Sequence, residues 1–468
     1  MQSFIGRKNE LEALEREYQR NSGFVIIYGR RRVGKTTLIK EFIKNKSAIY
    51  FLATEEVEIQ AKKHLLNNIA EFTGQDYLKN ANFEDWEDIF KILAKYKPNE
   101  KKILIIDEFQ YLIQVNSAFP SIFQKVWDNI LKDNNIMVIL CGSLISMMTT
   151  HVLSYESPLY GRRTSQIRLQ PLKFTEILDN YPNRTFEELV EFYAITGGVP
   201  KYFEFFENGK ISIEDIKNNI LSKSGFLYEE PLFLLRNEVR EPINYFSIIK
   251  TISEGNHKLS KMSSALEQKT NSLSPYLSTL IDLYLIEKRV PITEKVPEKS
   301  RKGLYFINNN FIKFWFAYIY PNRGELELDN QQLVIDKLKD SFKSNFVGFI
   351  YEDICKDVFT KLCREGAIDF SPSKIGSYWN GNGSIEIDIV SIDNTNKKIF
   401  AAECKYYRDK ELDMEVYSSL IEKCKTPDFK GYDIIYGLFS ITGFEKRLLE
   451  IAKKNKNLIL INNDEICM

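Results

Sequence analysis

A short glycine-rich stretch near the start of the chain carries the residue types that bind phosphates. Gly29-Arg-Arg-Arg-Val-Gly34-Lys35-Thr36 satisfies the pattern G-x-x-x-x-G-K-[ST]. The two glycines let such a loop fold tightly, so that its backbone N–H groups converge on a phosphate while the lysine reaches the β- and γ-phosphates. The hydroxyl of Thr36 is expected to hold Mg²⁺. The pattern therefore predicts ATP contacts from Gly29, Arg30, Arg31, Arg32, Val33, Gly34, Lys35, Thr36 and Thr37.

Two adjacent acids follow an apolar run further along the chain. Residues 103–106 precede Asp107 and Glu108, and neighbouring carboxylates at the end of a buried strand are costly without a cation. Asp107 fits the acid that binds the Mg²⁺ shell in Walker B sites, and Glu108 fits the base that polarises the attacking water. Ser143, at the end of the next apolar run, is placed to sense the γ-phosphate. An ordinary helix cap is the alternative for the acid pair, although the phosphate loop favours the catalytic interpretation.

Strands and helices must bring these residues together. Residues 24–28 form a short apolar run, the glycine loop follows it, and a helical pattern covers residues 35–44. Further apolar runs and helical patterns alternate along the chain; the runs are 48–52, 103–106 and 136–140, and the helical patterns are 55–72 and 83–95. Buried strands that alternate with helices predict an α/β fold, with a parallel sheet covered by helices on both faces. This context disfavours the alternative of a chance glycine loop before a helix.

Five segments follow one another within the first two hundred residues: Phe4-Ile5-Gly6-Arg7 with Glu10-Leu11, GRRRVGKTT, LIIDEFQ, Pro158-Leu-Tyr-Gly-Arg-Arg163 and Gly197-Gly-Val-Pro200. In this order they resemble the archaeal-type ATPases, which are P-loop proteins related to the AAA and STAND groups. The resemblance implies that Phe4, Ile5 and Arg7 lie near the adenine. It also implies that Arg162 or Arg163 contacts the γ-phosphate and that residues 198–200, ending in Pro200, close over the nucleotide. Chemistry alone leaves open that the two arginines are exposed charges.

A change of pattern between residues 246 and 307 predicts a second module. Three helical stretches lead to a strand pair at 286–291 and 303–307, and three helices followed by a hairpin is the winged-helix order. The hairpin has a basic excess suited to the phosphates of DNA: Lys288, Arg289, Lys295, Lys299, Arg301 and Lys302 against Glu287, Glu294 and Glu298. The presumed recognition helix, NSLSPYLSTLID, has no lysine or arginine. Contact with the ATPase domain alone is therefore the alternative to DNA binding.

Acids and a lysine recur at a spacing of two residues near the C-terminus. Two alternating stretches, IEIDIVSI and KIFAAECK, indicate strands joined by a short loop. If the turn is centred in that loop, Asp388 faces Glu403. Glu386 then faces Lys405 on the same face of the hairpin. Like charges placed opposite one another are unfavourable unless a metal ion lies between them, so the pattern predicts one or two Mg²⁺ ions positioning water at a phosphodiester, with Lys405 stabilising the developing charge.

An acid on one strand followed by Glu-x-Lys on the next resembles the PD-(D/E)XK nucleases. By that resemblance Asp388, Glu403 and Lys405 form the catalytic site, with Asp388 and Glu403 as metal ligands, and Glu352 on the preceding helix is the extra acid that many members carry. The C-terminal segment also resembles a domain of unknown function often joined to the archaeal-type ATPases, and it implies a smaller α/β, restriction-endonuclease-like fold. Ile387 stands where the motif has proline. A solvated hairpin with scattered salt bridges, or a nuclease fold without activity, is the alternative.

The composition is that of an ordinary globular protein with more than one domain. At 468 residues the chain exceeds what a single core usually organises. Lys plus Arg and Asp plus Glu number 64 each, so a nucleic-acid surface must be a local patch. Six cysteines without a Cys-x-x-Cys pair, and only three histidines, disfavour a zinc site or a disulfide framework. No apolar run approaches the length that spans a bilayer, so a cytoplasmic protein without a membrane partner is expected.

These observations predict three parts: a P-loop ATPase domain over residues 1–200, a helical lid and winged-helix domain over 201–330, and a nuclease-like domain over 331–468. Binding and hydrolysis of ATP with Mg²⁺ would change the relation between the parts, and the last part would bind or cut DNA. A homo-oligomer or a nucleotide-dependent assembly is a further expectation. The alternative is an ATP-dependent switch or DNA-binding scaffold whose C-terminal domain is inert.

Overall fold

The structure is a computed structural model that describes residues 4–206, 209–300, 302–381 and 383–467. The chain forms two compact units. The first contains the chain up to Leu172 together with Val199–Lys201, and the second contains Lys173–Gly198 and the chain from Tyr202 onward. Arg301 of the predicted basic hairpin lies outside the described residues.

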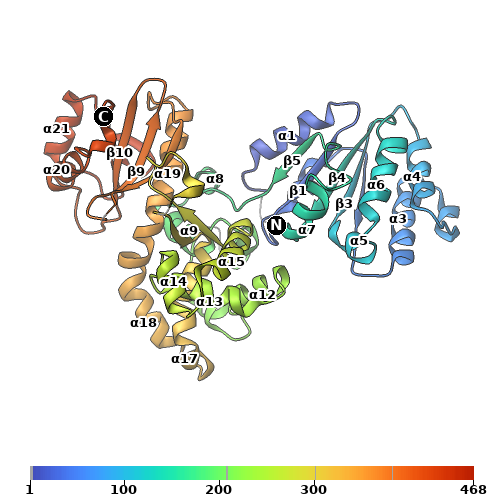
Figure 1. Ribbon diagram of the computed structural model, residues 1–468, viewed down its shortest axis with the longest axis horizontal. Helices are drawn as coiled ribbons and strands as arrows, with labels where there is room; N and C mark the ends of the chain where they lie inside the picture. The colour runs from blue at the N-terminus through green and yellow to red at the C-terminus, as the bar shows by residue number, and fades with distance from the viewer. Residues whose placement is uncertain (1–3, 207–208, 301, 382, 468) are drawn as a thin grey trace. The chain divides into compact units, whose positions relative to one another are not determined.

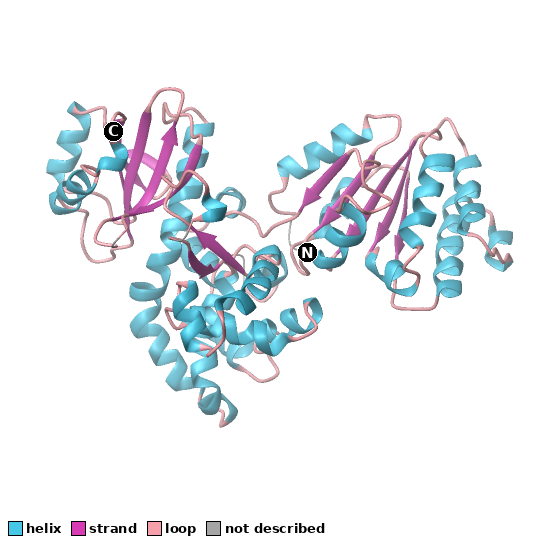
Figure 2. Ribbon diagram, viewed as in Figure 1, coloured by secondary structure: helices cyan, strands magenta, loops and turns pink. Residues whose placement is uncertain are grey.

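The first unit is built on a five-stranded sheet whose strands all run parallel, in the order β2-β3-β4-β1-β5 (Figures 1 and 2). Its strands are β1 (Phe24–Tyr28), β2 (Ala48–Leu52), β3 (Lys102–Asp107), β4 (Ile136–Gly142) and β5 (Ser165–Arg168). The four strands predicted from apolar runs are β1 to β4. The predicted α/β class with a parallel sheet is confirmed.

Helices cover both faces of this sheet because its strands are apolar on both sides. Val25 and Ile27 share one core with Leu38 of α2, whereas the ring of Phe24 packs against Phe123 and Trp127 on the opposite face. Neighbouring residues of one strand point to opposite faces, which is why an unbroken apolar run suits a sheet covered on both sides. The helices of this unit are α1 (Lys8–Tyr18), α2 (Lys35–Phe42), α3 (Glu58–Thr73), α4 (Trp86–Lys95), α5 (Gln110–Val115), α6 (Phe119–Val126) and α7 (Ile145–Met148).

The second unit begins with helices and a short hairpin. Three helices in sequence lead to the antiparallel pair β6 (Ile286–Arg289) and β7 (Leu304–Ile307), in the order predicted for residues 246–307. The helices up to this hairpin are α8 (Phe174–Asn180), α9 (Phe186–Thr196), α10 (Pro200–Phe203, which begins in the first unit), α11 (Ile213–Ile216), α12 (Glu230–Glu238), α13 (Pro242–Ser253), α14 (Leu259–Ala265) and α15 (Thr270–Asp282). This order of elements agrees with a winged helix, and the assignment of residues 246–307 to a winged-helix module stays a prediction.

The C-terminal part of the second unit is a smaller α/β domain with a mixed six-stranded sheet, in the order β13-β12-β11-β10-β9-β8. Its elements are α16 (Asn310–Phe314), α17 (Arg323–Glu327), α18 (Gln331–Ser341), α19 (Gly348–Arg364), β8 (Lys374–Trp379), β9 (Glu386–Asp393), β10 (Lys398–Lys405), α20 (Met414–Lys423), β11 (Asp433–Ser440), α21 (Lys446–Lys454), β12 (Leu458–Asn462) and β13 (Glu465–Cys467). The sequence predicted the β9–β10 hairpin but not the other four strands. Within the described residues, no helix combines the length and apolar character that crossing a membrane requires.

Candidate nucleotide site and C-terminal acid–lysine cluster

The predicted phosphate loop joins the end of β1 to the start of α2, as a phosphate-binding turn requires. A side chain at Gly29 would place its Cβ 2.3 Å from the backbone oxygen of Leu169, so only glycine fits there. Gly34 has φ 90°, in the left-handed region that favours glycine. Gly29 is therefore required by the close approach of Leu169, and Gly34 is favoured by its backbone conformation. The loop forms a tight turn at the carboxyl edge of the sheet.

Lys35 and Thr36 lie at the start of α2 and meet the end of β3. The ammonium of Lys35 donates to the backbone oxygens of Gly29, at 2.8 Å, and Arg30, at 3.1 Å, so it crosses the loop. The hydroxyl of Thr36 donates to Oδ2 of Asp107 at 2.9 Å. The structure thus brings together the two motifs that the sequence placed 71 residues apart. A hydroxyl and a carboxylate side by side are oxygen donors of the kind that Mg²⁺ prefers, so these two residues fit the predicted ion.

Tyr50 is a member of this site that the sequence analysis missed. Its hydroxyl donates a short hydrogen bond to the same Oδ2 of Asp107. Burial, followed by the charge of Asp107, raises the pKa of the Tyr50 hydroxyl well above its ordinary value, so it stays a donor. The sequence offered one signal, because Tyr50 places a phenol in an otherwise apolar strand run. In the structure this strand, β2, pairs with β3, which carries Asp107.

Glu108 belongs to a second small network at the same edge of the sheet. The hydroxyl of Ser143 donates to Oε2 of Glu108 at 2.7 Å, and the side-chain amide of Gln110 donates to the same oxygen. Gln110 is fully buried and also contacts Ser143, with its amide nitrogen 3.2 Å from the hydroxyl oxygen. Glu108 has φ 55°, which turns its side chain out of the strand direction. The predicted base and sensor are therefore direct neighbours, joined by a glutamine to which the sequence analysis gave no role.

The residues expected near the adenine lie against the phosphate loop or the core below it. Nη2 of Arg7 donates to the backbone oxygens of Val33, at 2.9 Å, and Gln170, at 2.6 Å. Phe4 and Ile5 are half-buried, and Phe4 packs against the α1–α2 core. Pro200 also adjoins the loop, because a Cβ built on Gly34 would lie 3.6 Å from its ring.

Arg162 and Arg163 lie at the opposite edge of the sheet from the phosphate loop. They precede β5, whose Ser165 is level with Val25 at the start of β1, whereas the loop follows the end of β1. A five-residue strand separates the two edges by roughly 16 Å. Arg162 forms an ion pair with Asp128 at 3.0 Å, and Arg163 lies over the ring of Tyr160 at 5.1 Å. This placement does not support the predicted contact with a γ-phosphate bound to the same chain.

The acids and lysine of the β9–β10 hairpin converge as their spacing predicted. The paired residues of this ladder end at Ile389 and Ala402, so the next position brings Asp388 and Glu403 opposite each other. Lys405 does not pair with Glu386: its ammonium lies 3.3 Å from Oδ2 of Asp388 and 2.7 Å from Oε2 of Glu403. The predicted register is confirmed. The position of Glu386 opposite Lys405 brings no contact between them, because the ammonium bonds to the half-buried Asp388 and the buried Glu403 while Glu386 is exposed.

A second lysine completes this acid–lysine cluster, which we define as Asp388, Glu403, Lys405 and Lys423. Lys423, from the last turn of α20, donates to Oε1 of Glu403 at 2.7 Å. Burial lowers the pKa of Lys405, but the charges of Asp388 and Glu403 outweigh it and the pKa is raised. Burial, with the charge of Glu403, raises the pKa of Asp388. Two lysines thus neutralise two acids.

The predicted metal ligands Glu352, Asp388 and Glu403 do not form a ready metal site. Across the described part of the chain, no group of three or more His, Cys, Asp or Glu side chains is arranged to hold a metal ion. Both carboxylate oxygens of Glu403 accept from lysines. Burial, followed by the charge of Asp388, raises the pKa of Glu352 to about 8. At neutral pH this carboxyl group is therefore mostly protonated. A metal at this site would compete with the two lysines for the oxygens of Glu403.

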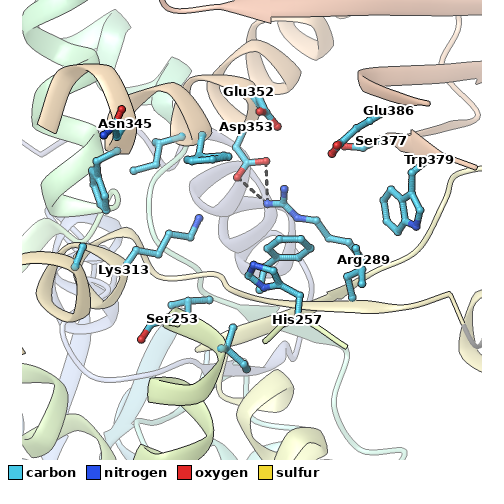
Figure 3. Close-up of a pocket in the computed structure, with 18 of the residues that line it drawn as sticks. Ser253, His257, Arg289, Lys313, Asn345, Glu352, Asp353, Ser377, Trp379 and Glu386 are labelled. Atoms are coloured by element: carbon cyan, nitrogen blue, oxygen red, sulfur yellow. Dashed lines mark hydrogen bonds and ion pairs between the residues drawn. The ribbon is translucent and has the colours of Figure 1, made fainter. Parts of the chain in front are cut away.

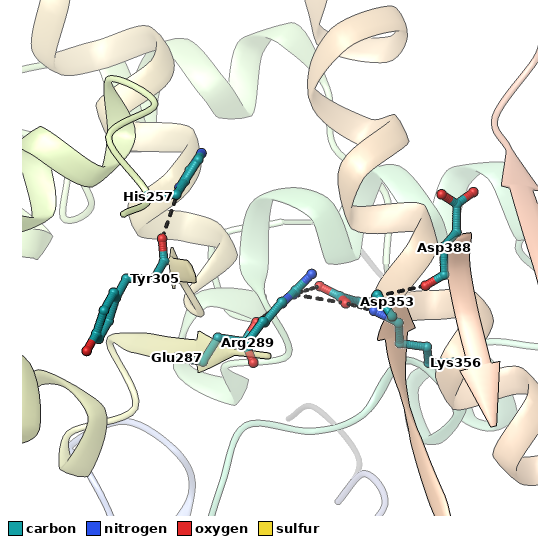
Figure 4. A network of polar contacts seen from close by, with 8 residues as sticks. His257, Glu287, Arg289, Tyr305, Asp353, Lys356 and Asp388 are labelled. Atoms are coloured by element: carbon teal, nitrogen blue, oxygen red, sulfur yellow. Dashed lines mark hydrogen bonds and ion pairs between the residues drawn. The ribbon is translucent and has the colours of Figure 1, made fainter. Parts of the chain in front are cut away.

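The basic residues of the β6–β7 hairpin are largely used within the fold (Figure 4). Arg289 donates to both oxygens of Asp353 on α19, at 3.0 and 2.8 Å, and also pairs with Glu287. Lys302 pairs with Glu294 at 2.8 Å. Glu287 and Glu294 were already counted against the basic residues, so Asp353 is the one further acid that these contacts set against the basic excess.

Comparisons with known proteins match two stretches of the chain. Residues 4–206 match the family described as an ATPase domain predominantly from Archaea, and residues 315–416 match a family of archaeal and bacterial proteins of unknown function. An uncharacterized protein of Methanocaldococcus jannaschii is 36% identical over 438 residues, which cover 93% of this chain and 95% of that protein. An uncharacterized ATP-binding protein of the same organism is 59% identical over 44 residues, which cover 9% of this chain and 75% of that protein.

Among solved structures, the Walker-type ATPase of Pyrococcus abyssi superposes with a TM-score of 0.50 and 20% identity, over 67% of this chain and 96% of the other. This likeness shows the fold. It agrees with a P-loop sheet that carries the Lys35 and Asp107 motifs at one edge.

Proposed function

Because this chain belongs to the family of ATPase-domain proteins found predominantly in Archaea, we propose that it hydrolyses ATP at the loop of residues 29–36. Thr36 and Asp107 are the residues that would hold Mg²⁺, which supplies positive charge to the phosphate oxygens. Lys35 contacts the phosphates, Glu108 orients the attacking water, and Ser143 holds the carboxylate of Glu108 in place. The observation that carries this proposal is the 2.9 Å contact between Thr36 and Asp107.

ATP turnover by the purified full chain, measured as phosphate release with and without Mg²⁺, tests the proposal. We expect turnover that requires Mg²⁺ and that is lost in Asp107→Asn. Turnover that persists in Asp107→Asn would place hydrolysis elsewhere.

An arginine at the far edge of the sheet can serve a nucleotide only in another copy of the chain. We therefore propose that Arg162 or Arg163 contacts the γ-phosphate of a neighbouring subunit in a nucleotide-dependent assembly. Mixing Lys35→Ala with an Arg162→Ala/Arg163→Ala double variant tests this, since each protein alone lacks one half of the site. We expect the mixture to hydrolyse ATP faster than the sum of its parts. Failure of the mixture to gain activity argues against a finger supplied in trans.

For the C-terminal domain we propose action on nucleic acid, supported by the convergence of Asp388, Glu403 and Lys405 on one face of the hairpin. The winged-helix order of residues 242–307 would supply DNA contacts, for which Lys295 and Lys299 are candidates. The test is incubation with plasmid and single-stranded DNA in Mg²⁺, with and without ATP. Cleavage should vanish in Asp388→Ala and Lys405→Ala and persist in Lys410→Ala, whose exposed ammonium lies 3.9 Å from Asp413. Cleavage that survives the first two changes would show that the site is elsewhere.

A second candidate is an ATP-dependent switch or scaffold with an inert C-terminal domain. The lysine-neutralised acids and the pairing of Arg289 with Asp353 favour it, because these groups are satisfied without a nucleic acid. DNA binding that depends on ATP, without cleavage under any metal condition, is the outcome expected of the switch. In either case we retain the proposed domains: 1–200 for the ATPase, 201–330 for the helical and winged-helix part, and 331–468 for the nuclease-like part.

A further inference from the structure

A cavity of about 420 Å³ lies within the second unit, and Glu352 and Glu386 of the C-terminal domain form part of its wall (Figure 3). Its walls come from α13, the β6–β7 hairpin, α16, α19 and the β8–β9 strands. This volume lies in the range of small-molecule sites, which are mostly apolar with a few convergent polar groups. Glu352 is the one lining residue that was given a role in the nuclease-like site, and the residues of the nucleotide site do not line this cavity.

The cavity has a pronounced aromatic wall. Phe306 contacts two flat groups: the ring of His257 stacks on it at 4.4 Å, and the guanidinium of Arg289 lies 5.0 Å from its centre. Trp379 lines the side opposite Lys313 (Figure 3). Phe349, on α19, is 71% exposed, which is unusual for a large apolar side chain. A flat apolar molecule would cover surface that the fold leaves in contact with water.

Lys313 supplies a cation inside this apolar setting. It is half-buried on α16 and reaches into the cavity in Figure 3. Among the described residues, no hydrogen bond or ion pair engages its ammonium. Burial lowers the pKa of Lys313, and the charge of Asp353 only partly offsets that effect. An ammonium that has lost solvent without gaining a counter-ion is costly, so an anion brought to it would be bound strongly.

Two of the other charged residues of the cavity are paired within the protein, and Glu352 and Glu386 also line it. Asp353 accepts from both Arg289 and Lys356, and the second partner of Arg289 is Glu287. His257 uses Nδ1 on the backbone oxygen of Tyr305, at 2.9 Å. Burial raises the pKa of Glu352 to about 8, and Glu386 is exposed to water, so Lys313 is the half-buried cation of this lining that a ligand can pair with.

We propose that this cavity binds a small anionic aromatic molecule, whose ring packs against the aromatic wall and whose carboxylate or phosphate pairs with Lys313. The inference rests on the cavity and its side chains, and it holds whether or not the chain cuts nucleic acid.

Two fluorescent dyes that differ by one anionic group test the proposal on the full chain. Anilinonaphthalene sulfonate carries the anion, and phenylnaphthylamine is its neutral counterpart. We expect Lys313→Met to weaken binding of the sulfonate about tenfold, the effect of removing one charge-assisted contact, and to change binding of the neutral dye less than about twofold. Lys313→Arg should restore the sulfonate. Trp379→Phe should reduce energy transfer from protein to dye.

Lys250→Met is the matched control, because Lys250 pairs with Glu254 at 3.6 Å and does not line the cavity. Unchanged binding of the neutral dye shows that a variant keeps the cavity folded. Equal weakening of both dyes by Lys313→Met, no weakening of either, or the same loss in Lys250→Met overturns the proposal.

Displacement of the bound sulfonate then distinguishes the two anions. Displacement by naphthoate assigns a carboxylate ligand, and displacement by naphthyl phosphate assigns a phosphate. If neither compound displaces the dye at concentrations that saturate the wild-type cavity, the anionic class is wrong.

Discussion

The phosphate loop and the acid–lysine cluster both place acids beside a lysine at strand ends, but they satisfy those charges differently. In the loop, Lys35 donates to two backbone oxygens, and the partners of Asp107 are the hydroxyls of Thr36 and Tyr50. In the cluster, Lys405 bonds directly to both acids, and Lys423 bonds to one of them.

This difference indicates how much each site depends on a ligand. Neutral partners leave the charges of Lys35 and Asp107 uncompensated, so a triphosphate and a cation would complete that site. The cluster is already close to neutral, and a metal must compete with ammonium groups for the same oxygens. The loop is organised for a ligand, whereas the cluster is also stable without one, and mutations should have larger functional effects at the loop.

The largest expected effect is at Lys35. Lys35→Ala removes the ammonium that would contact the β- and γ-phosphates, and we expect ATP turnover to fall about a hundredfold or more. Phosphate release by the purified variant measures this. Lys44→Ala is the control, because Lys44 follows the same helix and forms an exposed pair with Glu41. Turnover unchanged in Lys35→Ala would remove the distinction between the two sites.

The second prediction separates the two lysines of the cluster. Both lie 2.7 Å from Glu403, yet only Lys405 also reaches Asp388. If Lys423 competes with a metal, Lys423→Met should increase Mg²⁺ affinity about tenfold or more in a nucleotide-free calorimetric titration, because it removes one charge-assisted contact to Glu403.

The control for this titration is Lys423→Met combined with Asp388→Asn, which should lose the gain. Equal, undetectable Mg²⁺ binding by wild type and Lys423→Met would favour the inert C-terminal domain. It would also support the conclusion that the cluster, unlike the phosphate loop, does not depend on a bound ligand.

Local patterns explain which parts of these sites the sequence predicted. Lys35 and Thr36 are contiguous with the glycine loop, and the register that brings Asp388 to Glu403 follows from a short turn and a two-residue period. Tyr50 and Lys423 were missed because they arrive from separate elements. A phenol in an apolar run was the one local signal for Tyr50, and the neighbours of Lys423 in sequence do not point to the site.

A partner distant in sequence also changed the interpretation of the basic hairpin. Arg289 looked available for phosphate because the hairpin as a whole has a basic excess, but its main partner, Asp353, lies 64 residues away. The sheet around the cluster was incompletely predicted for a similar reason: β11 and β12 pair in parallel, and only the fold shows that pairing.

The third prediction concerns the network around Glu108. Ser143→Ala removes a 2.7 Å hydrogen bond to the proposed base and leaves Gln110 in place. Because the bond orients a charged group, we expect kcat for ATP to fall about tenfold while KM changes less than about twofold. Ser146→Ala, on an exposed position of α7, should leave both values unchanged. A rise in KM with normal kcat would instead mean that Ser143 binds nucleotide directly.

The smallest expected effect is at Asp357, an acid outside both sites. This residue serves to measure the free-energy cost of burying a single charge in the fold. Burial raises the pKa of Asp357 from 3.8 to about 6, against the opposing charge of Lys173. Between those pH values the folded chain holds a proton that the unfolded chain has lost, so stability falls as pH rises through this window and stays lowered above pH 6.

Asp357→Asn cannot ionise, and we expect it to raise the free energy of unfolding by about 1 kcal/mol at pH 7, with little change at pH 4. Urea unfolding at both pH values measures this, with Asp433→Asn as an exposed control at the start of β11. The side-chain oxygen of asparagine can still accept the backbone hydrogen bond from Phe174. If Asp357→Asn is destabilised by the same amount at both pH values, the carboxylate stabilises the fold through that hydrogen bond. The free-energy cost of burying a charge in this unit would then be smaller than the pairing of Glu403 with two lysines suggests.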